Sequence, residues 1–128
     1  MTESVGWHDL TVDDAAALRD FYVGVMGWQP EPVNMGGYAD YNMVLPSTGE
    51  AVAGICHARG VNSNLPPQWL VYFIVADIEH SAQRCTRLGG ELIAPIRSAG
   101  GSLYCVIRDP AGAVAALFQR VPRADEAR

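Results

Sequence analysis

GWHDLTVDDAAALRDFYVGVMGW, residues 6–28, predicts a strand followed directly by a helix. Apolar and polar side chains alternate over residues 4–12, as they do in a half-buried strand. Asp13 or Asp14 is the expected N-cap of the helix, and Gly27 is its expected end. Between them, apolar side chains recur at helical spacing, at Leu18, Phe21, Tyr22 and Val25. The stretch therefore forms one strand–helix unit.

The same unit occurs again 63 residues later in the chain. WLVYFIV, residues 69–75, is rich in β-forming side chains, Asp77 is the expected helix cap, and Gly89 and Gly90 end the helix. The identities at this offset include seven pairs: Val12 and Val75, Asp14 and Asp77, Gly27 and Gly90, Pro32 and Pro95, Gly37 and Gly100, Tyr41 and Tyr104, and Gly49 and Gly112. The chain thus contains one module of about sixty residues written twice.

Each predicted helix is followed by three strand candidates separated by Gly or Pro turns. These candidates are residues 28–33, 38–45 and 51–57 in the first half, and residues 91–96, 102–108 and 113–119 in the second. The predicted fold class is α+β with two tandem βαβββ modules. A two-copy ferredoxin-like fold is less favoured, because it needs a helix where residues 28–57 contain many Gly and Pro breaks.

The predicted modules belong to a single domain of residues 1–122. Module 1 covers about residues 4–61 and module 2 about residues 68–121, and the Pro-containing segment 62–69 connects them. Residues 122–128 are predicted to form a flexible tail.

Composition limits the classes of partner. The 128 residues carry a net charge of −5 with no basic cluster, so a nucleic-acid-binding surface is not expected. No apolar run is long enough to span a bilayer, and the N-terminus lacks a signal sequence, so we expect a soluble, cytoplasmic protein with no membrane partner. The three cysteines are widely spaced and odd in number, which predicts reduced thiols rather than disulfides.

Several segments resemble the vicinal-oxygen-chelate superfamily of glyoxalases, bleomycin-resistance proteins and extradiol dioxygenases. They are FYVGVMGW (21–28), VAGI (52–55), VADI (75–78), LGGEL (88–92) and DPAGAVAALFQ (109–119). The resemblance covers roughly residues 5–120. It implies curved mixed sheets that form a cup, helices outside the cup, a small organic ligand inside it, and a homodimer, since relatives commonly are dimers. In enzymes of the superfamily, His, Gln or Glu side chains from the first and last strands of the modules hold a divalent metal.

The metal-ligand positions implied by this resemblance carry no suitable donors. The opening-strand position falls on Trp7 and, at the repeat offset, on Leu70. The last-strand position falls on Ala116, and its first-module counterpart is Ala53 or Gly54. None of these side chains has a lone pair for a metal. Other possible ligands do not form a metal spacing: Cys56, His57 and His80. We therefore expect no metal at the usual site and no cofactor.

Strand alternation predicts which side chains face the cup. Trp7 and Asp9 share one face of the opening strand, and His8, Leu10 and Val12 share the other. Because the second set is mostly apolar, we expect it beneath the helix, with Trp7 and Asp9 facing the cup. The same alternation predicts that three residues of the second module face the cup: Leu70, Tyr72 and Phe118. For the equivalent tyrosines Tyr41 and Tyr104, the sequence does not decide which face of the strand they occupy. The expected ligand-binding residues are Trp7, Asp9, Tyr41, Leu70, Tyr72, Tyr104 and Phe118.

Two main functions stay open on the sequence. The favoured one is a bleomycin-resistance-like protein that binds an aromatic or amphipathic molecule in an apolar cup without a metal. The alternative is a superfamily enzyme, such as a lyase, isomerase or dioxygenase, with a displaced metal site or with Asp9 or a tyrosine as a metal-independent acid or base. A raised pKa of Asp9 would favour the alternative. A module that binds no ligand is a third possibility, and no catalytic residue is assigned.

Overall fold

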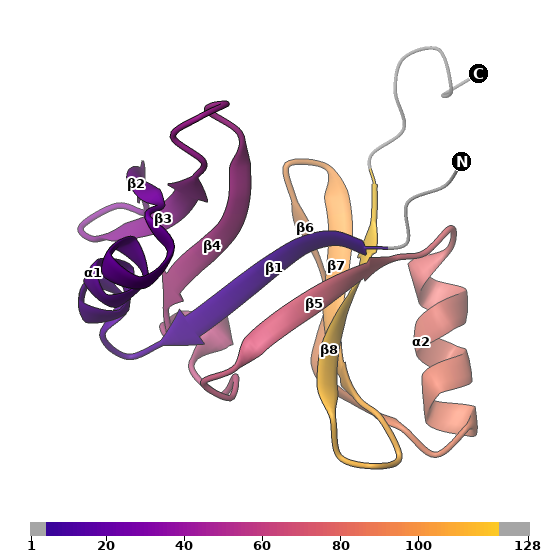
Figure 1. Ribbon diagram of the computed structural model, residues 1–128. Coiled ribbons are helices and arrows are strands. Elements are labelled where there is room, and N and C mark those ends of the chain that lie inside the picture. The colour runs from indigo at the N-terminus through magenta and orange to yellow at the C-terminus, as the bar shows by residue number, and fades with distance from the viewer. Residues whose placement is uncertain (1–4, 121–128) are drawn as a thin grey trace. The chain divides into compact units, whose positions relative to one another are not determined.

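The computed structural model describes residues 5–120, apart from the side chains of residues 61 and 99 (Figure 1). The predicted tail lies outside these residues. The chain is a mixed α+β protein in which the order strand, helix and three strands occurs twice, as predicted. The first run is β1 (Val5–Val12), α1 (Ala15–Met26), β2 (Gln29–Asn34), β3 (Ala39–Val44) and β4 (Ala51–His57). The second run is β5 (Trp69–Ile74), α2 (Ile78–Arg87), β6 (Glu91–Ala99), β7 (Ser102–Arg108) and β8 (Val114–Gln119).

The helix ends follow the capping pattern expected from the sequence. The Asp14 carboxylate accepts a hydrogen bond from the Ala17 backbone N–H at 3.1 Å, which settles the choice between the two candidate caps. Gly27 adopts a left-handed conformation (φ 74°) at the end of α1. Asp77 caps α2 through the His80 N–H at 3.2 Å. Within residues 5–120, no helix is both long and apolar enough to cross a membrane.

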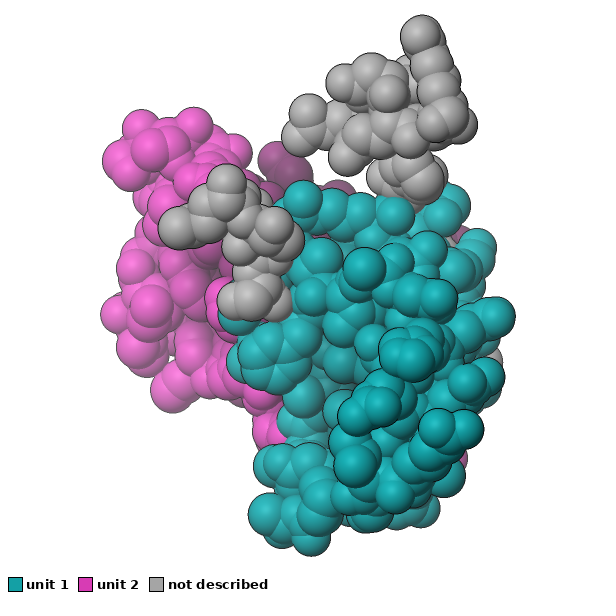
Figure 2. Space-filling view, turned by 90° about the vertical axis from the view of Figure 1, so that its right-hand side faces the viewer, with its two compact units in different colours: residues 1–6, 71–128 teal, residues 7–70 magenta. Residues whose placement is uncertain are grey.

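The described chain forms two compact units, residues 7–70 and residues 5–6 with 71–120 (Figure 2). In the first unit the strand order is β2-β3-β4-β1. β2, β3 and β4 pair antiparallel in sequence, and β1 pairs with β4 in parallel. The helix α1 packs on one face of this sheet, where Ala15, Met43, Ala53 and Ile55 form the buried core.

The second unit repeats this arrangement with the strand order β5-β8-β7-β6. β5 pairs with β8 in parallel, and the remaining pairs are antiparallel. Its core lies under α2 and consists of Ile78, Cys105 and Leu117. All three cysteines of the chain are free thiols, in line with the sequence.

The predicted facing of β1 is confirmed. Leu10 is opposite Ile55 of the α1 core in the β1–β4 ladder, and Val12 packs against the same core. The alternate residues Trp7 and Asp9 therefore lie on the face that points away from α1. We call this the open face of the first sheet, and the face of the second sheet that points away from α2 is its open face.

Two features were not predicted from the sequence. A short 3-10 helix, η1 (Gly60–Asn62), begins the connecting segment. The strand β6 continues to Ala99, beyond the predicted end at residue 96, although Pro95 lacks a backbone donor. The β6–β7 ladder accommodates this proline with register shifts on both sides of Ala94. Beyond the shifts, pairing resumes up to a turn at residues 100–101, where both glycines have positive φ.

Candidate functional site

Trp7 and Asp9 form a fixed pair on the open face of the first sheet. The Trp7 indole Nε1 donates a hydrogen bond to Asp9 Oδ1 at 2.7 Å. The second carboxylate oxygen, Oδ2, accepts a longer contact from the Cys56 thiol of β4 at 3.7 Å. Both oxygens of Asp9 are thus engaged by side chains from two neighbouring strands, which fixes the orientation of the carboxylate.

Gly54 makes room for this pair. It is opposite Asp9 in the parallel β1–β4 ladder. A Cβ atom at this position would collide with Asp9 Oδ1 and would lie 3.2 Å from Trp7 Nε1. The φ of Gly54 is not in the left-handed region, so the requirement for glycine is one of space and not of backbone conformation.

The environment of Asp9 raises the pKa of its carboxyl from 3.8 to about 6. Burial is the main cause, because a carboxylate that loses water is destabilised relative to the neutral acid. The hydrogen bonds from Trp7 and Cys56 act in the opposite direction but do not compensate, and the negative charge of Asp40 raises the pKa further. Asp9 therefore changes its protonation state close to physiological pH.

Cys56 acts as a protonated donor in this group. Burial and the neighbouring carboxylates of Asp9 and Asp40 raise the pKa of its thiol well above its usual range. A thiol in this state is a poor nucleophile, because the thiolate is the reactive form. The side chain consequently serves to hold Asp9 and not to attack a substrate.

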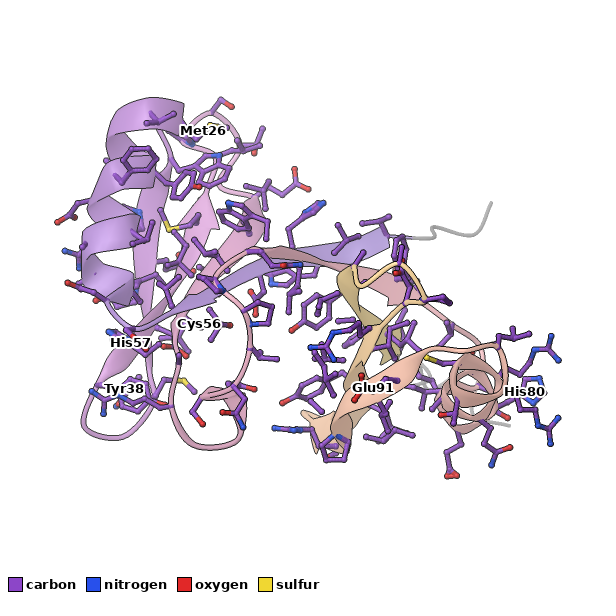
Figure 3. All side chains as sticks on the ribbon, turned by 90° about the horizontal axis from the view of Figure 1, so that it is seen from below. Met26, Tyr38, Cys56, His57, His80 and Glu91 are labelled. Carbon is purple, nitrogen blue, oxygen red and sulfur yellow. The ribbon has the colours of Figure 1, made fainter. Side chains whose placement is uncertain are left out.

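Asp40 links this group to the end of β4. Its Oδ1 accepts the backbone N–H of His57 at 2.9 Å and lies 3.4 Å from His57 Nδ1. The Tyr38 ring packs edge-on against the His57 ring with 5.5 Å between centroids, and the Arg59 guanidinium lies 4.2 Å from the Tyr38 ring centroid. Figure 3 labels Tyr38, Cys56 and His57 at this end of the unit.

The open face of the second sheet is aromatic and apolar. Arg97 of β6 is opposite Tyr104 of β7, Tyr104 is opposite Phe118 of β8, and Phe118 is opposite Ile74 of β5. The alternate residues of β7 and β8 belong to the α2 core, so this row points away from the helix. Its members are half-buried. The row is a surface on which a flat molecule could stack.

Two further residues predicted to bind the ligand lie on the same face of β5. Tyr72 is opposite Ala116 in the β5–β8 ladder, so these two side chains point to the same face of the sheet. Leu70 precedes Tyr72 by two residues in β5, so its side chain points to that face as well. Leu70 is only 1% exposed. Its side chain is therefore fully buried.

The two equivalent tyrosines lie on opposite sides of their sheets. Tyr41 packs against the core beneath α1, and the guanidinium of Arg19 from that helix lies 4.8 Å from its ring centroid. Tyr104 lies on the open face of the second sheet. Tyr41 is thus placed among core side chains, apart from the face that carries Asp9.

The registers of the β1–β4 and β5–β8 ladders identify which residue of the first module is equivalent to Ala116. Asp9 is opposite Gly54, and Tyr72, the equivalent of Asp9 in the second module, is opposite Ala116. Gly54 is therefore the structural equivalent of Ala116. The other candidate, Ala53, lies in the core beneath α1.

The sequence of residues 4–117 matches the sequence model of the glyoxalase/bleomycin resistance protein/dioxygenase superfamily. The chain belongs to this superfamily. Among curated proteins of similar sequence, the anthracycline biosynthesis protein DnrV of Streptomyces peucetius is 31% identical, and the match covers 89% of this chain and 46% of DnrV. The chain thus spans less than half the length of this relative.

Solved structures of the superfamily share the fold. A glyoxalase/bleomycin resistance protein/dioxygenase superfamily member from Vibrio splendidus superposes with a TM-score of 0.60 at 15% identity, covering 91% of this chain and all of that one. Methylmalonyl-CoA epimerase from Mycobacterium tuberculosis superposes with a TM-score of 0.54 at 16% identity, covering 97% of this chain and 92% of that one. At these identities the likeness establishes the fold alone.

The residues at the superfamily's usual metal positions do not fit a divalent metal. Trp7 has only an N–H, which is bonded to Asp9, and Leu70, Gly54 and Ala116 have no donor atom. Within the described part of the chain, no three His, Cys, Asp or Glu side chains are grouped so that they could hold a metal ion. A superfamily mechanism that passes through such a metal therefore has no support from this donor set.

Sequence reasoning missed three residues near these faces. Asp40 and Cys56 had no role assigned as partners of Asp9, because the register of β3 against β4 that brings them together is not encoded locally in the sequence. Arg97 lay beyond the predicted end of its strand. Counting back from a two-residue turn at residues 100–101 would have paired it with Tyr104.

Proposed function

We propose that the protein binds a small, flat or amphipathic organic molecule on the open face of the second sheet, without a metal at the superfamily's usual positions. The half-buried row across the second sheet, in which Tyr104 and Phe118 are neighbours, carries this proposal. Aromatic rings present large apolar surfaces at defined orientations and favour stacked ligands. We further propose that the protein does so as a homodimer, as relatives in this superfamily commonly do.

Two other observations support a binding role. The side chains at the positions that the resemblance assigns to the metal lack donors, and within residues 5–120 no three His, Cys, Asp or Glu side chains are grouped to hold one elsewhere. The name of the relative DnrV refers to anthracycline biosynthesis, which makes planar organic compounds reasonable first ligands to test.

A fluorescence titration with N-phenyl-1-naphthylamine, a neutral aromatic dye, tests the proposal. We expect the wild-type protein to bind the dye equally well with and without EDTA. F118A should weaken binding about tenfold, because it removes the stacking surface. F21A is the matched control, since Phe21 is 56% exposed on α1 and should not contribute. Equal affinities of F118A and F21A, or binding that requires a divalent metal, would contradict the proposal.

A second candidate function rests on Asp9. A carboxyl with a pKa of about 6, fixed by Trp7 and Cys56, is suited to accept or return a proton near neutral pH. We propose this metal-independent acid–base role as the alternative to simple binding. In such a step the ionised carboxylate accepts a proton from an acidic C–H group and then returns one that has exchanged with solvent.

Hydrogen–deuterium exchange tests this alternative. We would incubate the protein with EDTA and methylmalonyl-CoA in D2O, because a structurally similar protein is named as the epimerase of that compound. Loss of the C2–H signal in NMR spectra should accelerate as the pH rises through about 6, where Asp9 ionises, and D9N should abolish it. Exchange no faster than in buffer, or unchanged in D9N, would argue against Asp9 as the base for this substrate.

A further inference from the structure

Arg97 occupies an irregular part of β6 that points its side chain across the open face of the second sheet. It follows Pro95 by two residues and lies just beyond the second register shift of the β6–β7 ladder. Opposite it is Tyr104, and the guanidinium carbon of Arg97 lies 5.6 Å from the Tyr104 ring centroid. The guanidinium therefore borders the aromatic row that the proposed function uses.

One nitrogen of this guanidinium lacks an acceptor. Arg97 Nε donates to the Pro95 carbonyl oxygen at 3.5 Å, but Nη1 is buried and has no hydrogen-bond partner among the described residues. By contrast, Arg108 at the other end of the same hairpin donates to Glu91 at 2.7 Å. A buried charged donor without an acceptor is costly, so such groups generally meet a partner.

We infer that Arg97 Nη1 binds an anionic oxygen of the ligand, and that the ligand is an amphipathic molecule whose flat part lies on Tyr104 and Phe118 and whose acidic group meets the guanidinium. This inference rests on the proposed function and narrows its ligand class. A guanidinium forms directed, charge-assisted hydrogen bonds with carboxylates, sulfonates and phosphates. Its position next to the aromatic row places the charge and the stacking surface within reach of one small molecule.

A pair of dyes with the same ring skeleton isolates the contribution of charge. 8-Anilinonaphthalene-1-sulfonate carries an anionic group, and N-phenyl-1-naphthylamine does not. We expect R97Q to weaken binding of the sulfonate about tenfold while changing affinity for the neutral dye less than twofold. R97K keeps the charge but loses the forked geometry, so its loss should be intermediate. R87Q, a change in the last turn of α2, is the matched control and should alter neither affinity.

The outcomes separate this inference from the function on which it rests. If both dyes bind and R97Q weakens them equally, or weakens neither, the assignment of Arg97 is wrong while the binding function stands. If neither dye binds the wild-type protein, the binding function fails and the inference fails with it. Inorganic phosphate at the concentration of the dye should not displace the sulfonate. Displacement would identify a site for a free anion and overturn the amphipathic ligand class. Thermal melts of each variant check that its fold is retained.

Discussion

G54A should lower the free energy of unfolding by about 2 to 3 kcal/mol, the cost of forcing a methyl group into a packed site. The new Cβ would overlap Asp9 Oδ1 and press on Trp7 Nε1, so the hydrogen bond between these side chains must break or β1 must move away from β4. Urea denaturation followed by circular dichroism measures the change, with unfolding midpoint and slope determined for each variant.

G24A is the control for adding the same methyl group. Gly24 lies in α1, and a Cβ there would meet nothing within 4 Å, so this variant should be slightly more stable than the wild type. Combining G54A with D9A removes the atom with which the methyl group collides. The double variant should therefore lose less stability than the sum of the single changes. Additive effects would show that the collision with Asp9 is not the cause.

D9N should remove a pH dependence of stability that the wild-type protein shows between about pH 4 and pH 6. The pKa of Asp9 is raised from 3.8 to about 6 on folding, so the folded state binds more protons than the unfolded state within this window. The contribution of Asp9 to the free energy of unfolding must then fall as the pH rises, by at most about 3 kcal/mol. Above this window, D9N should be more stable than the wild type, because it has no buried charge.

Urea denaturation at a series of pH values from 4 to 8 measures this effect. D13N changes an exposed aspartate before α1 and should keep the wild-type pH dependence. If D9N kept the same slope as the wild type, the burial of Asp9 could not be its source. A direct measurement of the Asp9 titration by carboxyl-carbon NMR would then show whether its pKa is raised at all.

Local patterns in the sequence predicted most of the fold. The caps Asp14 and Asp77 and the terminating Gly27 act within a few residues, so their roles follow from sequence alone. The offset of 63 residues placed both helices and all eight strands in the right order. Alternation along β1 then assigned Trp7 and Asp9 to the face opposite α1, since a strand needs only one correctly placed residue to fix the rest.

Features that depend on pairing between strands could not be predicted in the same way. The side of Tyr41 depends on the register of β3 and β4 relative to α1, and no residue near Tyr41 encodes it. The extension of β6 past Pro95 depends on register shifts that compensate for the missing N–H. The raised pKa of Asp9 comes from burial and from the negative charge of Asp40, which only the assembled sheet brings together.

The opposite facing of Tyr41 and Tyr104 shows how the surfaces of the two halves differ. The offset of 63 residues aligns the two helices. In β4 and β8, however, Gly54 and not Ala53 corresponds to Ala116, so residues aligned at this offset point to opposite faces of their sheets. Shifting a strand by a single position exchanges its inner and outer side chains while leaving its hydrophobic alternation intact. The first open face carries the carboxylate of Asp9, and the second carries aromatic rings beside a guanidinium. The shift brings Tyr104 and Phe118 to the second open face, whereas their equivalents at the offset of 63, Tyr41 and Ile55, lie in the core beneath α1.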